Sequence, residues 1–124
     1  RKMSGWRMRT VVYDPWVSPW VAKEHNVEQV HDLLELARQV DYVTVHVPHN
    51  KQTDKLFGEA EFKAMKSTAF FVNTCRGKVQ DEEALIKSLQ SGEIAGAGLD
   101  VFATEPTPAD NPVRTRSNVV TTRH

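Results

Sequence analysis

The chain has 124 residues, in which 16 Lys and Arg balance 16 Asp and Glu, and it has a single cysteine. This length predicts one domain, a net charge of zero argues against nucleic acid or an anionic membrane as a partner attracted by charge, and one cysteine excludes an intrachain disulfide. Because the chain also lacks the run of about 18 apolar residues that spans a membrane, we expect a cytoplasmic protein that binds neither nucleic acid nor membrane.

The first predicted strand covers residues 10–13, which are Thr, Val, Val and Tyr. Pro15 ends this strand and leaves Asp14 at its tip. An acidic residue in that position binds a ribose hydroxyl in dinucleotide-binding folds. The alternative is an aspartate that only shapes a turn.

Two tryptophans, Trp16 and Trp20, flank the pair Ser18-Pro19. Serine followed by proline is typical of a helix N-cap and the first helical position. We expect the indole rings to fill the core beneath this loop, and the alternative is an exposed contact surface.

The rest of the chain alternates helices with strands. Helices are predicted over 31–38, 59–65 and 81–92, and strands over 42–47, within 69–78, over 94–99 and over 118–122. This order predicts an α/β fold of βαβ units, with a parallel sheet and flanking helices. Parallel strands end at one edge of a sheet, where ligands bind. The residues that this arrangement gathers there are Asp14, His46, Arg76, Asp100 and His124.

Three of the polar residues together suit the reduction of a 2-keto acid. The guanidinium of Arg76 can bind a carboxylate through two hydrogen bonds, although the alternative for Arg76 alone is a solvated loop arginine. A protonated His124 would pass its proton to the carbonyl oxygen as hydride reaches the carbon. Glu105, hydrogen-bonded to that imidazole, would favour the charged form and fix the ring orientation. No side chain supplies hydride, so this chemistry requires a cofactor.

Five short blocks follow one another along the chain: Tyr13-Asp14-Pro15, His46-Val47-Pro48, residues 72–77, residues 96–106 and residues 118–124. In these blocks and in their order, the sequence resembles the nucleotide-binding domain of the D-isomer-specific 2-hydroxyacid dehydrogenases. That family contains D-3-phosphoglycerate dehydrogenase and glyoxylate/hydroxypyruvate reductase. The similarity extends from about residue 8 to the end of the chain.

The resemblance implies a Rossmann-type fold, NAD as the cofactor, and interconversion of a small D-2-hydroxy acid and its 2-keto acid by a homodimeric enzyme. It assigns catalysis to Arg76, Glu105 and His124, and it makes Asp14 the residue that binds the adenosine ribose and favours NAD over NADP. The cofactor-binding residues that it implies are Asp14, His46, Val47, Pro48, Thr53, Thr74, Cys75, Arg76 and Asp100.

The sequence departs from the family pattern in two ways. The glycine-rich phosphate loop and its strand have no counterpart, because the segment Gly96-Ala97-Gly98 leads into a strand and not into a helix. Arg123 stands where the family usually has proline before the histidine. We therefore expect residues 1–124 to be a partial NAD-binding domain that lacks the first strand and the glycine-rich loop. Without a substrate-binding domain, this fragment should be inactive alone.

Two other functions compete with the dehydrogenase. An NAD-sensing, corepressor-like binding module has the same fold, and Trp16 and Trp20 would then form its partner surface. A hydrolase with Cys75 as nucleophile would need a lowered thiol pKa, which Arg76 could assist. No metal site is expected, since His46 and His49 span a proline and have no third ligand nearby.

Overall fold

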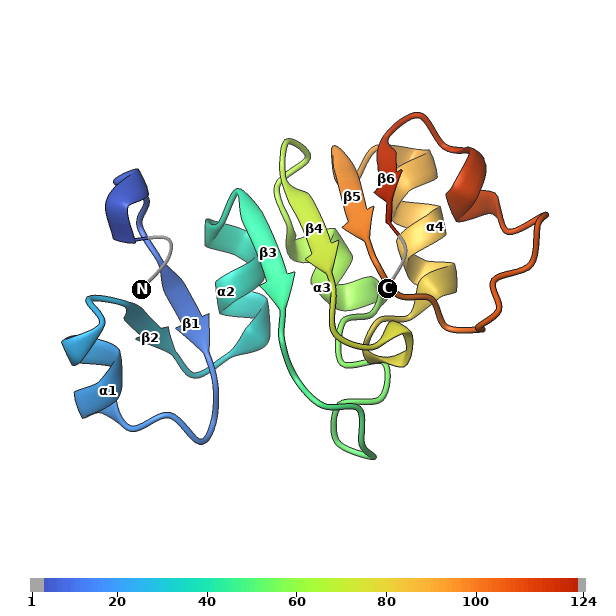
Figure 1. The fold of residues 1–124 in the computed structure, drawn as a ribbon. Helices are drawn as coiled ribbons and strands as arrows, with labels where there is room; N and C mark the ends of the chain where they lie inside the picture. The colour runs from blue at the N-terminus through green and yellow to red at the C-terminus, as the bar shows by residue number, and fades with distance from the viewer. Residues whose placement is uncertain (1–3, 123–124) are drawn as a thin grey trace.

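The computed structural model describes residues 4–122, and its strands form two parallel sheets (Figure 1). In the smaller sheet, β1 (Val11–Tyr13) pairs with β2 (Glu28–Val30). In the larger sheet the order is β3 (Tyr42–Val45), β4 (Phe70–Asn73), β5 (Gly96–Leu99) and β6 (Val119–Thr121). Every pairing between these strands is parallel. The expected α/β class, with a parallel Rossmann-type sheet, is confirmed.

The helices are α1 (Pro19–Glu24), α2 (Leu33–Gln39), α3 (Glu59–Ala64) and α4 (Glu82–Ser91), with 3₁₀ turns at Ser4–Trp6, Gly77–Val79 and Pro112–Thr115. In Figure 1, α2, α3 and α4 cover one face of the larger sheet. Successive side chains of a strand point to opposite faces, so Val43 and Phe71 are buried under these helices while Tyr42 and Phe70 are exposed. No helix in the described part of the chain is long and apolar enough to cross a membrane.

A cluster of three buried phenylalanines positions the loop that follows β3. The ring of Phe57, in that loop, lies 4.9 Å from the ring of Phe71 on β4 and 5.0 Å from that of Phe62 on α3. All three side chains are fully buried, and burying an aromatic side chain of this size contributes roughly 1.5–3 kcal/mol. The cluster therefore holds the loop after β3 close to the carboxyl end of β4.

The prediction for the two tryptophans is wrong. Ser18 does cap α1, since its Oγ accepts a hydrogen bond from Val21 N at 3.4 Å, and Pro19 is the first helical residue. However, Trp16 and Trp20 are 87% and 70% exposed. Of the six residues of α1, only Ala22 is buried, so this short helix offers no core large enough to receive an indole ring.

Two further differences concern strands. β2 was not predicted, because Glu28 and Gln29 are polar and a segment of three residues shows no clear alternation. The strand expected over 42–47 ends at Val45, before the proline at position 48. The predicted α4 is confirmed at both ends, with Asp81 as its N-cap and Gly92 in the left-handed conformation (φ 75°) as its C-cap.

Asp81 joins the start of α4 to the loop after β3. Its carboxylate accepts hydrogen bonds from the backbone N–H groups of Glu83 (3.1 Å) and Ala84 (3.2 Å) and pairs with Lys55 Nζ at 2.9 Å. The hydrogen bond from Lys55, followed by those from the two backbone groups, lowers the pKa of the Asp81 carboxyl below its usual value.

We expect Asp81→Ala to lower the free energy of unfolding by about 1 kcal/mol at pH 7, as the loss of an N-cap does. Because the pKa of Asp81 is lower in the folded state than in the unfolded state, this contribution is present at neutral pH. It is lost as the pH falls below about 4, through the folded-state pKa. Urea unfolding at pH 7 and pH 3 tests this, with Asp110→Ala as an exposed control. A difference between wild type and Asp81→Ala that is as large at pH 3 as at pH 7 would contradict it.

Candidate active site

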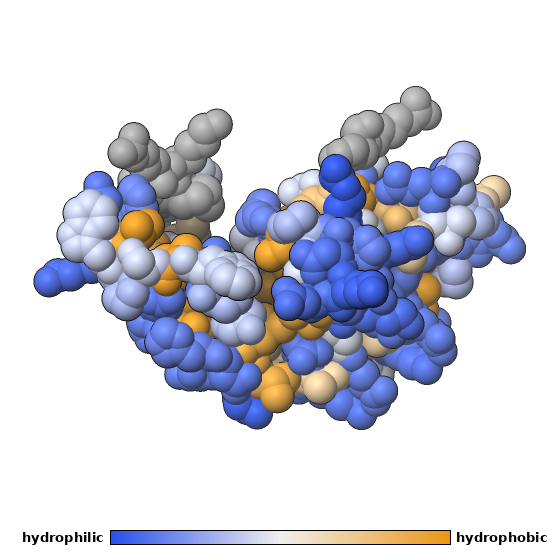
Figure 2. Space-filling view, turned by 90° about the horizontal axis from the view of Figure 1, so that it is seen from below, coloured by the Kyte–Doolittle hydropathy of each residue, from blue (hydrophilic) through white to orange (hydrophobic). Residues whose placement is uncertain are grey.

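A cavity of about 610 Å³ lies between β1 and β3. Its walls include residues 11–13 of β1 and 43–45 of β3, together with Leu33 and Leu36 of α2. Among the described residues, β1 and β3 belong to separate sheets, so each turns an unpaired edge toward the other. Figure 2 looks onto the carboxyl ends of the strands and shows apolar surface in the hollow between the two parts of the molecule.

The carboxyl end of this cavity gathers five of the predicted cofactor-binding residues. They are Asp14 after β1 and His46, Val47, Pro48 and Thr53 after β3. A crevice outside the carboxyl ends of parallel strands is where α/β folds bind their ligands. The residues at the carboxyl end of this cavity therefore suit a dinucleotide, with Asp14 on one side and the 46–53 loop on the other.

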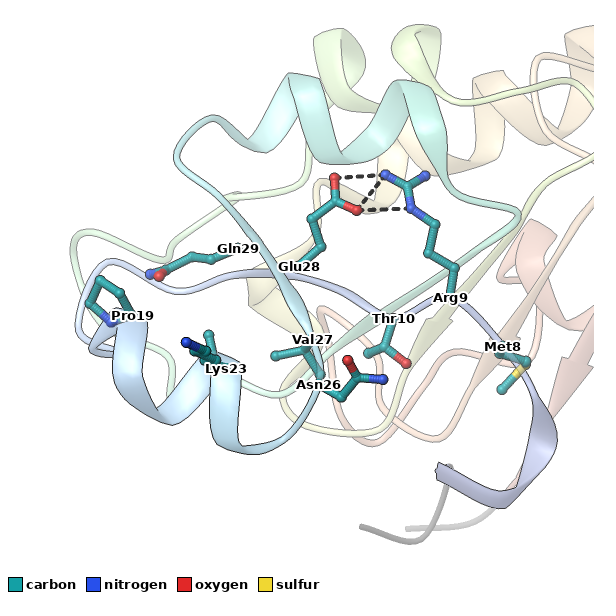
Figure 3. Close-up of a pocket in the computed structure, with 10 residues that line it drawn as sticks. Met8, Arg9, Thr10, Pro19, Lys23, Asn26, Val27, Glu28 and Gln29 are labelled. Carbon is teal, nitrogen blue, oxygen red and sulfur yellow. Dashed lines mark hydrogen bonds and ion pairs between the residues drawn. The ribbon is translucent and has the colours of Figure 1, made fainter.

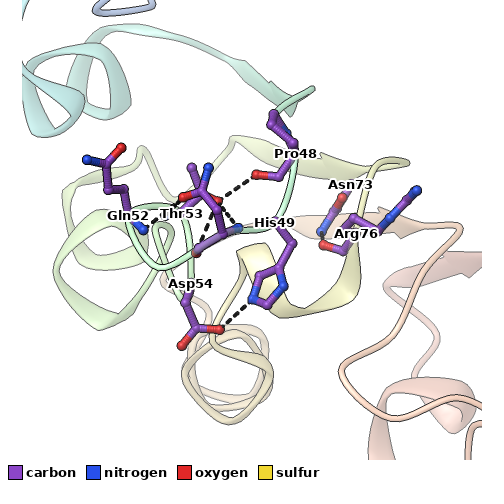
Figure 4. A network of polar contacts seen from close by, with 8 residues as sticks. Pro48, His49, Gln52, Thr53, Asp54, Asn73 and Arg76 are labelled. Carbon is purple, nitrogen blue, oxygen red and sulfur yellow. Dashed lines mark hydrogen bonds and ion pairs between the residues drawn. The ribbon is translucent and has the colours of Figure 1, made fainter.

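Local hydrogen bonds give both sides of this cavity their shape. Thr53 Oγ1 donates to Pro48 O at 2.6 Å and accepts from Asn50 N at 2.9 Å, which closes the loop after β3 (Figure 4). Asp14 Oδ1 accepts from Trp16 N at 2.8 Å. The turn-forming role of Asp14 is thus present, and its second carboxylate oxygen is the atom that could bind a ribose hydroxyl.

The structure does not bring the other predicted cofactor residues to the wall of this cavity. Thr74, Cys75 and Arg76 follow β4, and Asp100 follows β5, further along the same edge of the sheet. The partly buried Cys75 thiol donates a hydrogen bond to Asn73 Oδ1 at 3.1 Å, and Asp100 accepts one from the Thr122 hydroxyl.

A second cavity, of about 460 Å³, brings Arg76 and Glu105 together. Arg76 follows β4 and Glu105 lies in the loop after β5, so the parallel pairing of these strands delivers both to one edge. The two loops touch at Gly77, where a Cβ atom would lie only 1.8 Å from Phe102 O. The Glu105 carboxylate turns back to accept a hydrogen bond from Phe102 N at 3.0 Å. The predicted carboxylate anchor and its acidic partner therefore line one cavity.

His124, the third predicted catalytic residue, lies outside the described residues, as does Arg123. β6 runs parallel to β5 and ends at Thr121, and Thr122 N donates to Leu99 O at 2.9 Å. The role of His124 stays a prediction.

Two residues with titratable side chains line the second cavity although the sequence did not predict them there. These are His49 and Lys78, and His49 Nε2 lies 2.7 Å from Asp54 Oδ1 (Figure 4). The sequence pattern indicates no role for His49 other than that of a metal ligand, for which a third ligand is missing. The position of Lys78, two residues after Arg76, was the one signal that could have suggested its place.

A third cavity, of about 540 Å³, lies beside α1, and it is lined by Arg9 and the exposed Lys23 but by none of the predicted site residues (Figure 3). Its arginine, Arg9, donates to both carboxylate oxygens of Glu28 at 2.7–2.9 Å and to Gln39 Oε1 at 2.6 Å. These bonds occupy the guanidinium, and we assign this cavity no part in catalysis.

The whole chain, residues 1–124, matches the family described as D-isomer specific 2-hydroxyacid dehydrogenase, NAD binding domain. The chain belongs to this family. The family resemblance inferred from the sequence is therefore confirmed, and NAD, the expected cofactor, is the one for which this dehydrogenase domain is described.

Relatives of this NAD-binding domain are dehydrogenases and reductases. Glyoxylate reductase of Korarchaeum cryptofilum is 45% identical over 124 residues, which are all of this chain and 37% of that protein. D-3-phosphoglycerate dehydrogenase of Methanocaldococcus jannaschii is 40% identical over the whole chain and 24% of its own length. D-mandelate dehydrogenase of Rhodotorula graminis, solved in a holo form, superposes with a TM-score of 0.88 at 40% identity, over 97% of this chain and 35% of that one.

The chain thus spans 37% and 24% of the length of these two curated relatives. None of the three proteins is a corepressor, and the comparisons do not favour the corepressor-like alternative.

Proposed function

We propose that this domain belongs to an NAD-dependent oxidoreductase that interconverts a D-2-hydroxy acid and its 2-keto acid. The observation that supports the proposal is the meeting of Arg76 and Glu105 at one cavity. Five residues expected to bind the cofactor line a neighbouring cavity at the same edge of the sheet. Family membership supports the same reaction class.

The roles of the residues follow from their chemistry. NAD, when bound, accepts hydride from the 2-hydroxy acid, or supplies it as NADH in the reverse direction. Arg76 binds the substrate carboxylate and polarises the keto group. His124 donates or accepts the proton at the substrate oxygen, and Glu105 orients the imidazole and favours its protonated form. Asp14 binds the ribose hydroxyls of the adenosine and thereby favours NAD over NADP.

We also infer that the NAD-binding domain is completed by one more parallel strand in the cavity between β1 and β3, supplied by a segment with a glycine-rich loop. Glu28 N donates to Thr10 O, and Phe70 N donates to Asp41 O. Because hydrogen bonds alternate along a strand, the backbone groups of Val11, Tyr13 and Thr44 point to the opposite edges, toward the cavity. If the strand is absent in the functional protein, the amides of these three residues will exchange rapidly with solvent.

The test of function uses a protein that joins this chain to a glycine-rich segment and a substrate-binding domain. We expect it to oxidise NADH in preference to NADPH with glyoxylate, hydroxypyruvate or 3-phosphohydroxypyruvate at neutral pH, and to sediment as a homodimer. This chain alone should show no turnover. Binding of NADH without reduction of any of these acids would contradict the proposed activity.

A further inference from the structure

A buried side-chain network lies behind the loop that carries Arg76. Asn73, the last residue of β4, is fully buried, and Gln80, which follows the 3₁₀ turn Gly77–Val79, is 1% exposed. Asn73 Nδ2 donates to Gln80 Oε1 at 2.9 Å and to Arg76 O at 3.0 Å. The pair therefore ties together the two ends of the segment 73–80, with Arg76 in the middle. Figure 4 shows Asn73 beside Arg76.

The other half of the Asn73 amide shapes the same segment. Its Oδ1 accepts from Cys75 N at 3.0 Å, which makes an Asx turn directly before Arg76. Val79 N donates to Arg76 O at 3.2 Å. The backbone carbonyl of Arg76 is thus held from both sides, and the direction in which its guanidinium leaves the backbone depends on these bonds.

Gln80 supplies a hydrogen-bond acceptor to this network, but the same side chain also buries an unpaired donor, which destabilises the fold. Its Nε2 is buried and has no hydrogen-bond partner among the described residues. Turning the Gln80 amide over does not help, because Nε2 would then face Asn73 Nδ2. Turning over the amides of both Gln80 and Asn73 would place Asn73 Nδ2 next to Cys75 N, and both of these groups are hydrogen-bond donors. A buried donor without an acceptor destabilises a fold, so packing alone gives no reason for glutamine at this position.

We propose that Gln80 is a positioning residue for Arg76. Through Asn73, its Oε1 fixes the backbone of the Arg76 segment and so the pose of the carboxylate anchor. This role rests on the function proposed above. The groups that carry it are the acceptor oxygen of Gln80 and the amide of Asn73, and neither needs to touch the substrate.

Two variants of Gln80 separate this role from a merely structural one. Gln80→Met has a similar shape and lacks the acceptor. This substitution removes the unpaired donor Gln80 Nε2, but it also leaves one N–H of Asn73 Nδ2 without its acceptor. Because the two effects oppose each other, the thermal midpoint of Gln80→Met should stay close to that of wild type. Gln80→Glu keeps the acceptor oxygen but buries a carboxyl group, which should lower the midpoint. Gln80→Met should therefore disturb the position of Arg76 without lowering the thermal midpoint, whereas Gln80→Glu should lower the midpoint without disturbing that position.

In the dehydrogenase described above, we expect Gln80→Met to raise KM for the 2-keto acid by about tenfold or more, since small displacements of a binding group have large effects. Gln80→Glu should keep KM within about twofold of wild type, and Gln90→Met, on the exposed face of α4, should change nothing. The proposal is overturned if KM rises in Gln80→Glu and stays unchanged in Gln80→Met, because KM then follows stability.

A second readout does not depend on turnover. In ¹⁵N-labelled protein, the signals of the Asn73 side-chain amide and of the Cys75 and Arg76 backbone amides should shift in Gln80→Met and stay near their wild-type positions in Gln80→Glu. Unchanged signals in Gln80→Met would overturn the positioning role whether or not the enzyme is active. If the signals shift in Gln80→Met but the wild-type protein reduces none of the acids, the proposed function is wrong, while the control of the Arg76 segment by Gln80 still holds.

Discussion

Replacing Arg76 by glutamine should lower kcat/KM for a 2-keto acid by about 10²- to 10⁴-fold. A bidentate guanidinium pair makes two charge-assisted hydrogen bonds, each contributing roughly 1.5–3 kcal/mol, and each 1.4 kcal/mol is about a factor of ten. Arg76→Lys keeps the charge and loses the planar fork, so it should fall between wild type and Arg76→Gln. The rates of NADH oxidation in the proposed full-length dehydrogenase provide the measurement.

The matched control is Arg38→Gln, which changes an exposed arginine of α2 that does not line the cavity of Arg76. It should leave kcat/KM unchanged. Binding of NADH should be less affected than kcat/KM in Arg76→Gln, because five of the predicted cofactor-binding residues line a different cavity. If kcat/KM falls equally in Arg38→Gln and Arg76→Gln, or falls in neither, Arg76 is not the carboxylate anchor.

A single methyl group at Gly77 should have an effect of similar size. The Cβ of alanine would lie 1.8 Å from Phe102 O, 2.0 Å from Phe102 C and 2.6 Å from Ala103 N. These are backbone atoms and cannot rotate away, so the Arg76 and Glu105 loops must separate. We expect Gly77→Ala to lower the free energy of unfolding by about 1–3 kcal/mol and kcat/KM by about 100-fold or more.

Gly98→Ala is the matched control for this substitution. Gly98 lies on β5, and its nearest neighbours to an added Cβ are side-chain atoms of Val72 at 3.7 Å and 3.9 Å, which is ordinary contact. Both variants should be compared by urea unfolding and by NADH oxidation. If Gly77→Ala proves as stable and as active as Gly98→Ala, the close approach of the two loops is not needed for the site.

The meeting of Arg76 and Glu105 could be predicted because it depends on a rule of topology. Parallel strands joined by helices end at one edge, and both residues follow such strands. The same rule placed Asp14 and His46 at this edge, and the family resemblance added Val47, Pro48 and Thr53, which line the same cavity beside β1 and β3. The topology rule could not predict that Thr74, Cys75 and Asp100 lie away from that cavity. How far the end of one strand lies from another depends on the order of the strands in the sheet, which the rule does not give.

The sequence by itself determined the features that depend on neighbouring residues. The N-caps of Ser18 and Asp81 and the left-handed Gly92 follow from side chains that bond to the adjacent backbone or from a missing Cβ. Only the tertiary structure decided which side chains are buried and which distant groups meet. The exposure of Trp16, and the bond between Asn73 and Gln80 behind Arg76, depend on contacts between segments that no local pattern records.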